Sequence, residues 1–350
     1  MSIATVLVFL LIVALAAVNG SNDVPKGVAT LAGAGVTKYR VAILWGTVTT
    51  LVGCLCSVAL ASKMTQLFSS GVVTATPTSS FAVAVLIGAA GWVGLATVLR
   101  LPVSTTHALI GGLLGAGVLF APDSVAWNSI PERVVAPLLI SIAVAYAITL
   151  VLALCFGRVR TTRADASPTT VSPATADQGT SALLSAERIK VAEKHAPHRA
   201  LTIAHWLTSG ATGFARGLND TPKMVAIGAF ALVPAGMTPW QIMLVVAISM
   251  AVGSLLGGMR VAERLGQGVV QMNHREGFLA NLTTAVLVGM GASYGLPMST
   301  THVSTGAIAG SAGPNLSRLS GKTLRDFLIA WLVTPLFAAV VAAAVFAIAR

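Results

Sequence analysis

The sequence predicts an all-α protein that crosses a membrane many times and consists of two inverted-topology repeats. Of its 350 residues, 55% are hydrophobic and 9% are charged, whereas about a quarter of the residues in a typical soluble domain are charged. The mean hydropathy is +0.84, and two motifs occur twice in the same order. These observations exclude a soluble enzyme, a nucleic-acid-binding module and a disordered chain.

Apolar runs in the first half give the expected helices. The run 134–156 contains no charged residue and is long enough to span a bilayer. The runs 24–36 and 103–120 are short, and each follows an interruption, so we expect broken helices or re-entrant hairpins there. Short interrupted segments at matching places in two halves are typical of a transporter binding site. The expected runs are 3–20, 24–36, 41–62, 80–99, 103–120 and 134–156.

Two motifs divide the chain into halves. The first recurs near the start of the second half, as Asn22-Asp23-Val24-Pro25-Lys26 and Asn219-Asp220-Thr221-Pro222-Lys223. The second recurs as Leu101-Pro102-Val103-Ser104-Thr105-Thr106-His107 and Leu296-Pro297-Met298-Ser299-Thr300-Thr301-His302. We therefore predict a first transmembrane repeat over 1–156 and a second over 200–350. Between them, 157–199 reads as a linker, a disordered segment followed by a short amphipathic helix.

Basic residues predict the orientation of these repeats. Most Lys and Arg between the apolar runs fall in 157–199, 260–276 and 318–325, which the positive-inside rule places in the cytoplasm. The corresponding loops 63–80 and 260–276 then lie on opposite sides, so the halves are inverted. We expect a multi-pass protein of the plasma (inner) membrane, with the linker in the cytoplasm, both termini outside and the bilayer as its solvent. The excess of Lys and Arg over Asp and Glu is explained by this orientation in the membrane, so we expect no nucleic acid partner.

The Ser-Thr-Thr segments suit an oxyanion. Proline ends one helix, and Ser104-Thr105-Thr106 or Ser299-Thr300-Thr301 begins the next. A helix start offers unpaired N–H groups, hydroxyl donors and the positive end of the helix dipole. One copy alone reads equally well as an ordinary N-cap. Two copies in inverted halves predict helix starts that converge on one tetrahedral anion.

The Asn-Asp pairs are candidate cation sites. A carboxylate such as Asp23 or Asp220 inside an apolar segment costs about 2.5–3.5 kcal/mol on insertion scales. With Asn22 and Asn219, the carboxylates either cap the following half-helix, form an oxygen site for Na⁺, or carry H⁺. A co-transported cation would offset the repulsion between carboxylate and oxyanion and the inside-negative membrane potential.

Other polar residues near the motifs are further candidates for contact with the anion or with a proton. Lys26 and Lys223 follow three residues after each Asp and are expected to pair with it or with the anion. Arg216 and Arg100 are weaker candidates for anion contact. His107 and His302 read either as structural histidines or as proton carriers.

With these motifs, the sequence resembles the inorganic phosphate transporter family of sodium- or proton-coupled phosphate permeases, over nearly the whole chain outside 158–198. The resemblance implies a homodimeric symporter without an organic cofactor, with phosphate at the two Ser-Thr-Thr helix starts. It assigns ion coordination to Asn22, Asp23, Asn219 and Asp220. The chain departs from the family at Pro25-Lys26, where small residues are common, and a built-in lysine charge there would replace one sodium ion.

Three alternatives remain beside cation-coupled phosphate transport. The first is a permease for sulfate or another tetrahedral oxyanion, and the second is a passive anion channel. The third is an intramembrane aspartyl protease with Asp23 and Asp220 as its dyad. That reading leaves the Ser-Thr-Thr-His repeats without a role, so the sequence predicts a transporter and not an enzyme.

Overall fold

The structure is a computed structural model that describes residues 2–156, 199–268, 272–313 and 316–349. The predicted all-α class is confirmed, and seven of the described helices are long and apolar enough to cross a membrane. Apart from Arg199, the predicted linker lies outside the described residues. The α-helices are α1 (Ile3–Gly33), α2 (Tyr39–Leu60), α3 (Ser62–Gln66), α4 (Ser79–Val98), α5 (Thr105–Phe120), α6 (Ala136–Cys155), α8 (Arg199–Leu232), α9 (Pro239–Gly268), α10 (His274–Tyr294), α11 (Thr300–Ser311) and α12 (Gly321–Ala349).

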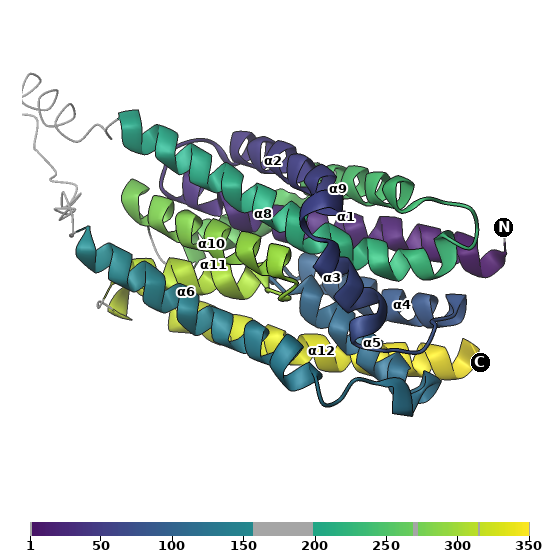
Figure 1. The fold of residues 1–350 in the computed structure, drawn as a ribbon. Coiled ribbons are helices and arrows are strands. Elements are labelled where there is room, and N and C mark those ends of the chain that lie inside the picture. The colour runs from purple at the N-terminus through teal and green to yellow at the C-terminus, as the bar shows by residue number, and fades with distance from the viewer. Residues whose placement is uncertain (1, 157–198, 269–271, 314–315, 350) are drawn as a thin grey trace, which may run out of the picture.

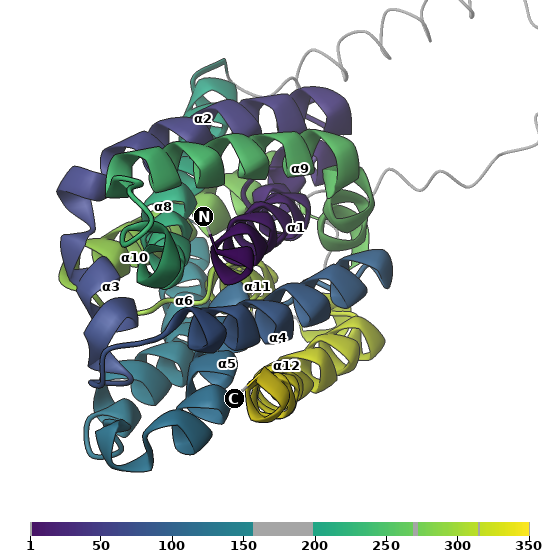
Figure 2. The same ribbon diagram turned by 90° about the vertical axis from the view of Figure 1, so that its right-hand side faces the viewer.

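Short irregular helices join these elements. Two π-helical turns cover Leu67–Gly71 and Pro131–Val135, and two 3₁₀ turns cover Pro122–Ser124 and Leu316–Arg318. The long helices lie roughly side by side, and both termini are at one end of the bundle (Figure 1). The end of α6 and the start of α8 lie at the opposite end. Viewed along the bundle, α1 lies near the middle, between α9 and α4 (Figure 2).

Helices of one half pack mainly on helices of the other. Helix α1 packs on α9, and α8, which carries the same motif, packs on α2. In the same way α5 packs on α12, while α11 packs on α6. Each of these contacts between the halves is thus matched by an equivalent contact in which the roles of the first and second half are exchanged. Inverted topology of the halves remains a prediction, which the opposite starting ends of α1 and α8 support (Figure 1).

Glycines allow the closest of these crossings. A Cβ atom on Gly20 would lie 2.0 Å from the carbonyl oxygen of Met250, and one on Gly253 would lie 1.9 Å from that of Ala17. The equivalent crossing of α2 and α8 uses Gly53, whose Cβ would lie 2.1 Å from the carbonyl oxygen of Phe214. Small residues at an interface let helix backbones approach closely. Larger residues at these positions would push the two halves apart.

The predicted helix break at Asn22-Asp23 is wrong. Helix α1 runs without interruption through Pro25, and α8 runs through Pro222. A proline removes one backbone hydrogen bond from a helix interior, but here neighbouring helices pack on both sides. The polar side chains find partners on other helices, so the backbone need not open to satisfy them. The expected short run 24–36 is therefore the second part of one long helix.

The predicted breaks before the Ser-Thr-Thr segments are confirmed. Helix α4 ends at Val98 and α5 begins at Thr105, while α10 ends at Tyr294 and α11 begins at Thr300. With 16 and 12 residues, α5 and α11 extend about 24 Å and 18 Å. Both are shorter than the roughly 30 Å of a hydrocarbon layer. The first residues of the two helices, Thr105 and Thr300, are buried inside the bundle.

Candidate functional site

The serine of each Ser-Thr-Thr segment is the N-cap of its helix. Ser104 Oγ accepts a hydrogen bond from the backbone N–H of His107 at 3.3 Å. Ser299 Oγ accepts the equivalent bond from His302 at 3.2 Å. A capping hydroxyl uses its oxygen as acceptor and keeps its hydrogen for a further partner. Both serines are buried, so a partner for that hydrogen has to come from within the protein.

The structure brings the two helix starts together. Thr301 Oγ1 donates to the carbonyl oxygen of Val103 at 2.6 Å, and Thr106 Oγ1 donates to that of Met298 at 3.3 Å. Val103 and Met298 are the residues directly before the two serines. Each helix start therefore holds the segment that leads into the other. Thr105 and Thr300 are buried beside them.

Two lysines bind both motifs at once. Lys26 Nζ contacts Asp23 Oδ1 on its own helix, the carbonyl oxygen of Val103 at 2.7 Å and Thr301 Oγ1 at 2.5 Å. Lys223 Nζ contacts Asp220 Oδ1 at 3.3 Å, in the equivalent pair. The prediction that each lysine pairs with its aspartate agrees with these contacts.

The second lysine repeats the same pattern of partners. Lys223 Nζ donates to Thr106 Oγ1 at 2.6 Å and to the carbonyl oxygen of Met298 at 3.5 Å. Each ammonium group thus contacts one carboxylate, one threonine hydroxyl and one backbone carbonyl. In each case the hydroxyl belongs to the other half of the chain. The two lysines therefore connect both copies of both motifs.

Asn19 connects the two carboxylates, and the sequence analysis did not identify it. Its Nδ2 atom lies 2.6 Å from Asp23 Oδ2 and 3.4 Å from Asp220 Oδ2, and it also donates to Thr105 Oγ1 at 2.9 Å. Asn19 is one helical turn before Asp23, on the same face of α1. An amide at this spacing in an otherwise apolar run was the signal that would have identified it.

The two motif asparagines differ in their use of the amide oxygen. Asn22 Oδ1 accepts from the backbone N–H of Val103 at 3.1 Å, and its Nδ2 donates to the carbonyl oxygen of Leu101 at 2.9 Å. Asn22 therefore fixes the segment before α5. Asn219 Nδ2 donates to Asp220 Oδ1 at 2.8 Å and to the carbonyl oxygen of Met298 at 3.1 Å. Its buried Oδ1 has no hydrogen-bond partner within the described residues.

Arg216 is a fully buried cation on α8, one turn before Asp220. Its exposed fraction is 1%, and one terminal nitrogen, Nη2, donates to Thr50 Oγ1. Its Nε and Nη1 atoms have no hydrogen-bond partner within the described part of the chain. A buried guanidinium group with donors of this kind suits an oxyanion. Arg100, the other arginine considered, is exposed.

The two motif histidines lie side by side behind the helix starts. The ring centroids of His107 and His302 are 4.5 Å apart, and His302 stacks near Trp331 at 4.3 Å. His302 Nδ1 lies 3.2 Å from the carbonyl oxygen of Leu138. These contacts give the rings a packing role between α5, α6, α11 and α12.

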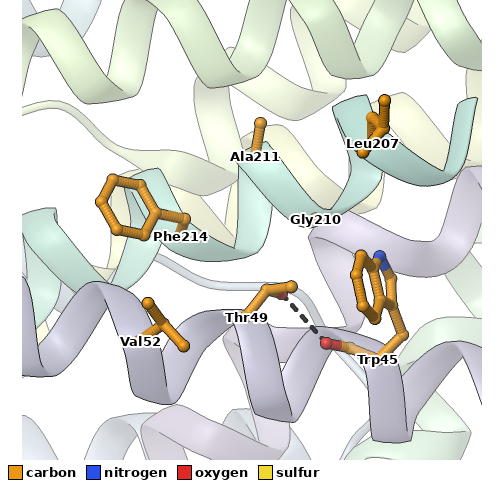
Figure 3. A pocket seen from close by; sticks show the side chains of 7 residues that line it. All are labelled: Trp45, Thr49, Val52, Leu207, Gly210, Ala211 and Phe214. Atoms are coloured by element: carbon orange, nitrogen blue, oxygen red, sulfur yellow. Dashed lines mark hydrogen bonds between the residues drawn. The ribbon is translucent and has the colours of Figure 1, made fainter. Parts of the chain in front are cut away.

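Two further features are distinct from the motif residues. The described residues hold no group of three or more His, Cys, Asp or Glu side chains placed to bind a metal ion. A hollow of about 250 Å³ lies between α2 and α8, lined by Trp45, Phe214 and other mostly apolar residues (Figure 3). The hydroxyl of Thr49 in this hollow donates to the carbonyl oxygen of Trp45 at 3.0 Å. This lining offers an oxyanion almost no partner.

Membrane-spanning helices around buried ion pairs and opposed helix starts define a membrane transport protein. The chain belongs to the phosphate transporter family, whose model matches residues 19–342.

Relatives support this assignment over most of the chain. A protein of Mycobacterium tuberculosis (strain CDC 1551 / Oshkosh), described as "Probable low-affinity inorganic phosphate transporter", is 29% identical over 90% of this chain and 70% of its own length. A Rhizobium meliloti protein of the same description is 26% identical over 93% of this chain and 90% of its own length. The solved structure described as "The sodium-dependent phosphate transporter" has the same fold, with a TM-score of 0.82, 23% identity and 99% coverage of both chains.

Proposed function

We propose that this protein carries inorganic phosphate across the plasma membrane by symport with a cation, Na⁺ or H⁺. One observation carries the proposal. The starts of α5 and α11 hold each other through the bond from Thr301 to Val103, and two buried lysines lie between them. Hydroxyls and ammonium groups from opposite halves thus meet at the two helix starts. The relatives described as inorganic phosphate transporters support phosphate as the anion.

The buried residues divide into donors and acceptors for phosphate. Ser104 and Ser299 supply hydroxyl hydrogens, and the helix starts supply N–H groups. Asp23 and Asp220 would accept a hydrogen bond from a protonated phosphate oxygen. Sulfate carries no such proton at neutral pH, so the carboxylates favour phosphate over sulfate. The amide oxygens of Asn19 and Asn219 would add neutral acceptors.

Transport measurements with purified protein in proteoliposomes test the proposal. Radiolabelled phosphate should accumulate above its external concentration when a Na⁺ or H⁺ gradient is imposed, each gradient being applied separately. Excess unlabelled phosphate should block uptake, and an equal concentration of sulfate should not. Equilibration without accumulation would indicate the passive channel instead. Inhibition by sulfate alone would indicate a sulfate permease.

An enzymatic alternative finds little support in the site. An aspartyl dyad works with one proton shared between two carboxylates. Here Asp23 and Asp220 are instead each engaged by a lysine of the same helix. The relatives described above are transporters.

We further propose that both termini face the outside and that residues 157–199 face the cytoplasm. In support, the termini lie at one end of the bundle and the helix ends that flank 157–198 lie at the other (Figure 1). A cysteine introduced at Ser2 in a cysteine-free variant should react with an impermeant maleimide on intact cells. A homodimer is proposed from the resemblance alone, and the mass of the detergent-solubilised protein by light scattering tests it.

A further inference from the structure

Buried charges in the described part of the chain do not balance. Three cations and two anions have exposed fractions of 2% or less: Lys26, Lys223, Arg216, Asp23 and Asp220. A buried charge is costly unless it is paired. After the two Lys–Asp pairs are formed, the charge of Arg216 remains. With each side chain counted at its ordinary charge, these five residues leave one positive charge in excess.

The ammonium groups of Lys26 and Lys223 occupy positions that would otherwise suit a small metal cation. Small hard cations bind carboxylate, hydroxyl and carbonyl oxygens. An ammonium group donates three hydrogen bonds to the same kinds of oxygen. Lys26 Nζ contacts one of each, from Asp23, Thr301 and Val103. A metal cation at this point would have to displace the lysine.

Lys223 has the matching set of oxygens with the halves exchanged. Its partners are Asp220 Oδ1 at 3.3 Å, Thr106 Oγ1 at 2.6 Å and the carbonyl oxygen of Met298 at 3.5 Å. Both places where a carboxylate meets the opposite helix start are therefore filled by a tethered cation.

We propose that Lys26 and Lys223 are built-in replacements for inorganic coupling cations, so that phosphate binding and transport by this chain do not require Na⁺. This inference rests on the proposed phosphate transport. Singly charged phosphate would pair with the positive charge of Arg216 and bring the buried site to neutrality without a metal ion. Adding Na⁺ to the neutral site would again leave one charge unpaired. The proposed function allows either Na⁺ or H⁺ as the coupling cation, so we infer that the cation is H⁺, which can travel on a phosphate oxygen.

Replacing sodium in the transport assay tests the wild-type protein. Phosphate uptake into proteoliposomes should change less than about twofold when Na⁺ is replaced by choline on both sides at constant pH. A loss of about tenfold or more in choline, a change in transition-state free energy of about 1.4 kcal/mol, would overturn the proposal. This arm needs no variant and therefore does not depend on the folding of one.

Two variants of one lysine test the replacement directly. Lys26→Ala leaves room for an ion, so uptake should fall about tenfold or more in choline and recover with added Na⁺ in a saturable manner. Lys26→Met removes the charge but fills the space, so Na⁺ should not restore uptake. Lys38→Ala, at an exposed lysine before α2, should behave as wild type. Uptake by Lys26→Ala that is indifferent to Na⁺ would overturn the proposal.

A binding measurement separates this inference from the proposed function. Phosphate should raise the melting temperature of the detergent-solubilised wild-type protein equally in choline and in Na⁺. If proteoliposomes show no uptake under any gradient, the transport proposal fails, and the melting temperatures still decide whether the anion site needs Na⁺. Stabilisation by phosphate only in Na⁺ would overturn the inference.

Discussion

Thr301 Oγ1 lies 2.6 Å from the carbonyl oxygen of Val103, so a side chain at the start of α11 is bonded to the segment that leads into α5. The same two oxygens accept hydrogen bonds from Lys26. A single contact thus joins both halves of the chain and one of their buried ion pairs. Substitutions at this contact should therefore reduce transport more strongly than they disturb the overall fold.

Replacing the two cross-bonding hydroxyls should slow transport. Thr301→Val and Thr106→Val keep the side-chain shape but remove the acceptor of a buried lysine, so we expect phosphate uptake to fall about tenfold, equivalent to about 1.4 kcal/mol. Thr74→Val is the control, because its hydroxyl donates to the carbonyl oxygen of Ser124 at 3.0 Å on an exposed surface. Wild-type uptake rates in both site variants would argue against a role for the helix starts in binding.

Removing one member of a buried ion pair should cost more than removing both. Asp23→Asn leaves Lys26 unpaired, which we expect to lower stability by about 3–5 kcal/mol and to abolish uptake while the protein still reaches the membrane. Adding Lys26→Met should recover most of the stability, because no buried charge is left without a partner. Uptake should stay absent.

Thermal unfolding in detergent and phosphate uptake are the two measurements for this double-mutant cycle. Asp220→Asn, alone and with Lys223→Met, provides the matched set in the other half. Equal stability of the single and double variants would show that the carboxylate and the ammonium group are not coupled.

Two glycines on neighbouring helices should respond oppositely to alanine. Gly20→Ala places a Cβ atom 2.0 Å from the carbonyl oxygen of Met250, so we expect a destabilisation of about 3 kcal/mol and loss of uptake. A Cβ atom on Gly91 meets nothing within 4 Å, and Gly91→Ala in α4 should stabilise by about 0.5–1 kcal/mol. Melting temperatures of the two variants check this prediction. A tolerated Gly20→Ala would mean that α1 and α9 cross less closely.

The two motif asparagines should separate stability from transport. Asn22→Ala leaves the buried N–H of Val103 without its acceptor, with an expected cost of about 1–3 kcal/mol in stability. Asn219 Oδ1 has no partner within the described residues, so Asn219→Ala should cost less stability and lower phosphate affinity instead. Melting temperature and the KM of uptake distinguish the two effects. Identical behaviour of the variants would remove the distinction.

Much of this arrangement follows from local patterns in the sequence. Proline before Ser104 and Ser299 predicts where α5 and α11 begin, because proline ends one helix and serine caps the next. The membrane-spanning runs follow from hydrophobicity and length. The spacing of three residues between Asp23 and Lys26 places both on one helix face, so their pairing is also predictable.

Other features depend on contacts that no local pattern encodes. The sequence predicts a break at Asn22-Asp23, but α1 is continuous there, with α9 and α4 packed on it. The contact between Lys26 and Thr301 joins residues 275 positions apart, and only the crossing of the two halves determines it. Asn19 lies one helical turn before Asp23, which the sequence shows, but its contact with Asp220 of the other half depends on the folded arrangement.

The contacts of α1 with the second half of the chain also have a consequence for biosynthesis. While the ribosome is still producing that half, Asn19 and Lys26 have their first-half partners but lack Asp220 and Thr301. Lipid is a poor solvent for such groups, so the newly made first half should either wait in the insertion machinery or insert incompletely until α8 and α11 arrive. Assembly of this protein is therefore a late event in its synthesis, and separately expressed halves should become stable only in each other's presence.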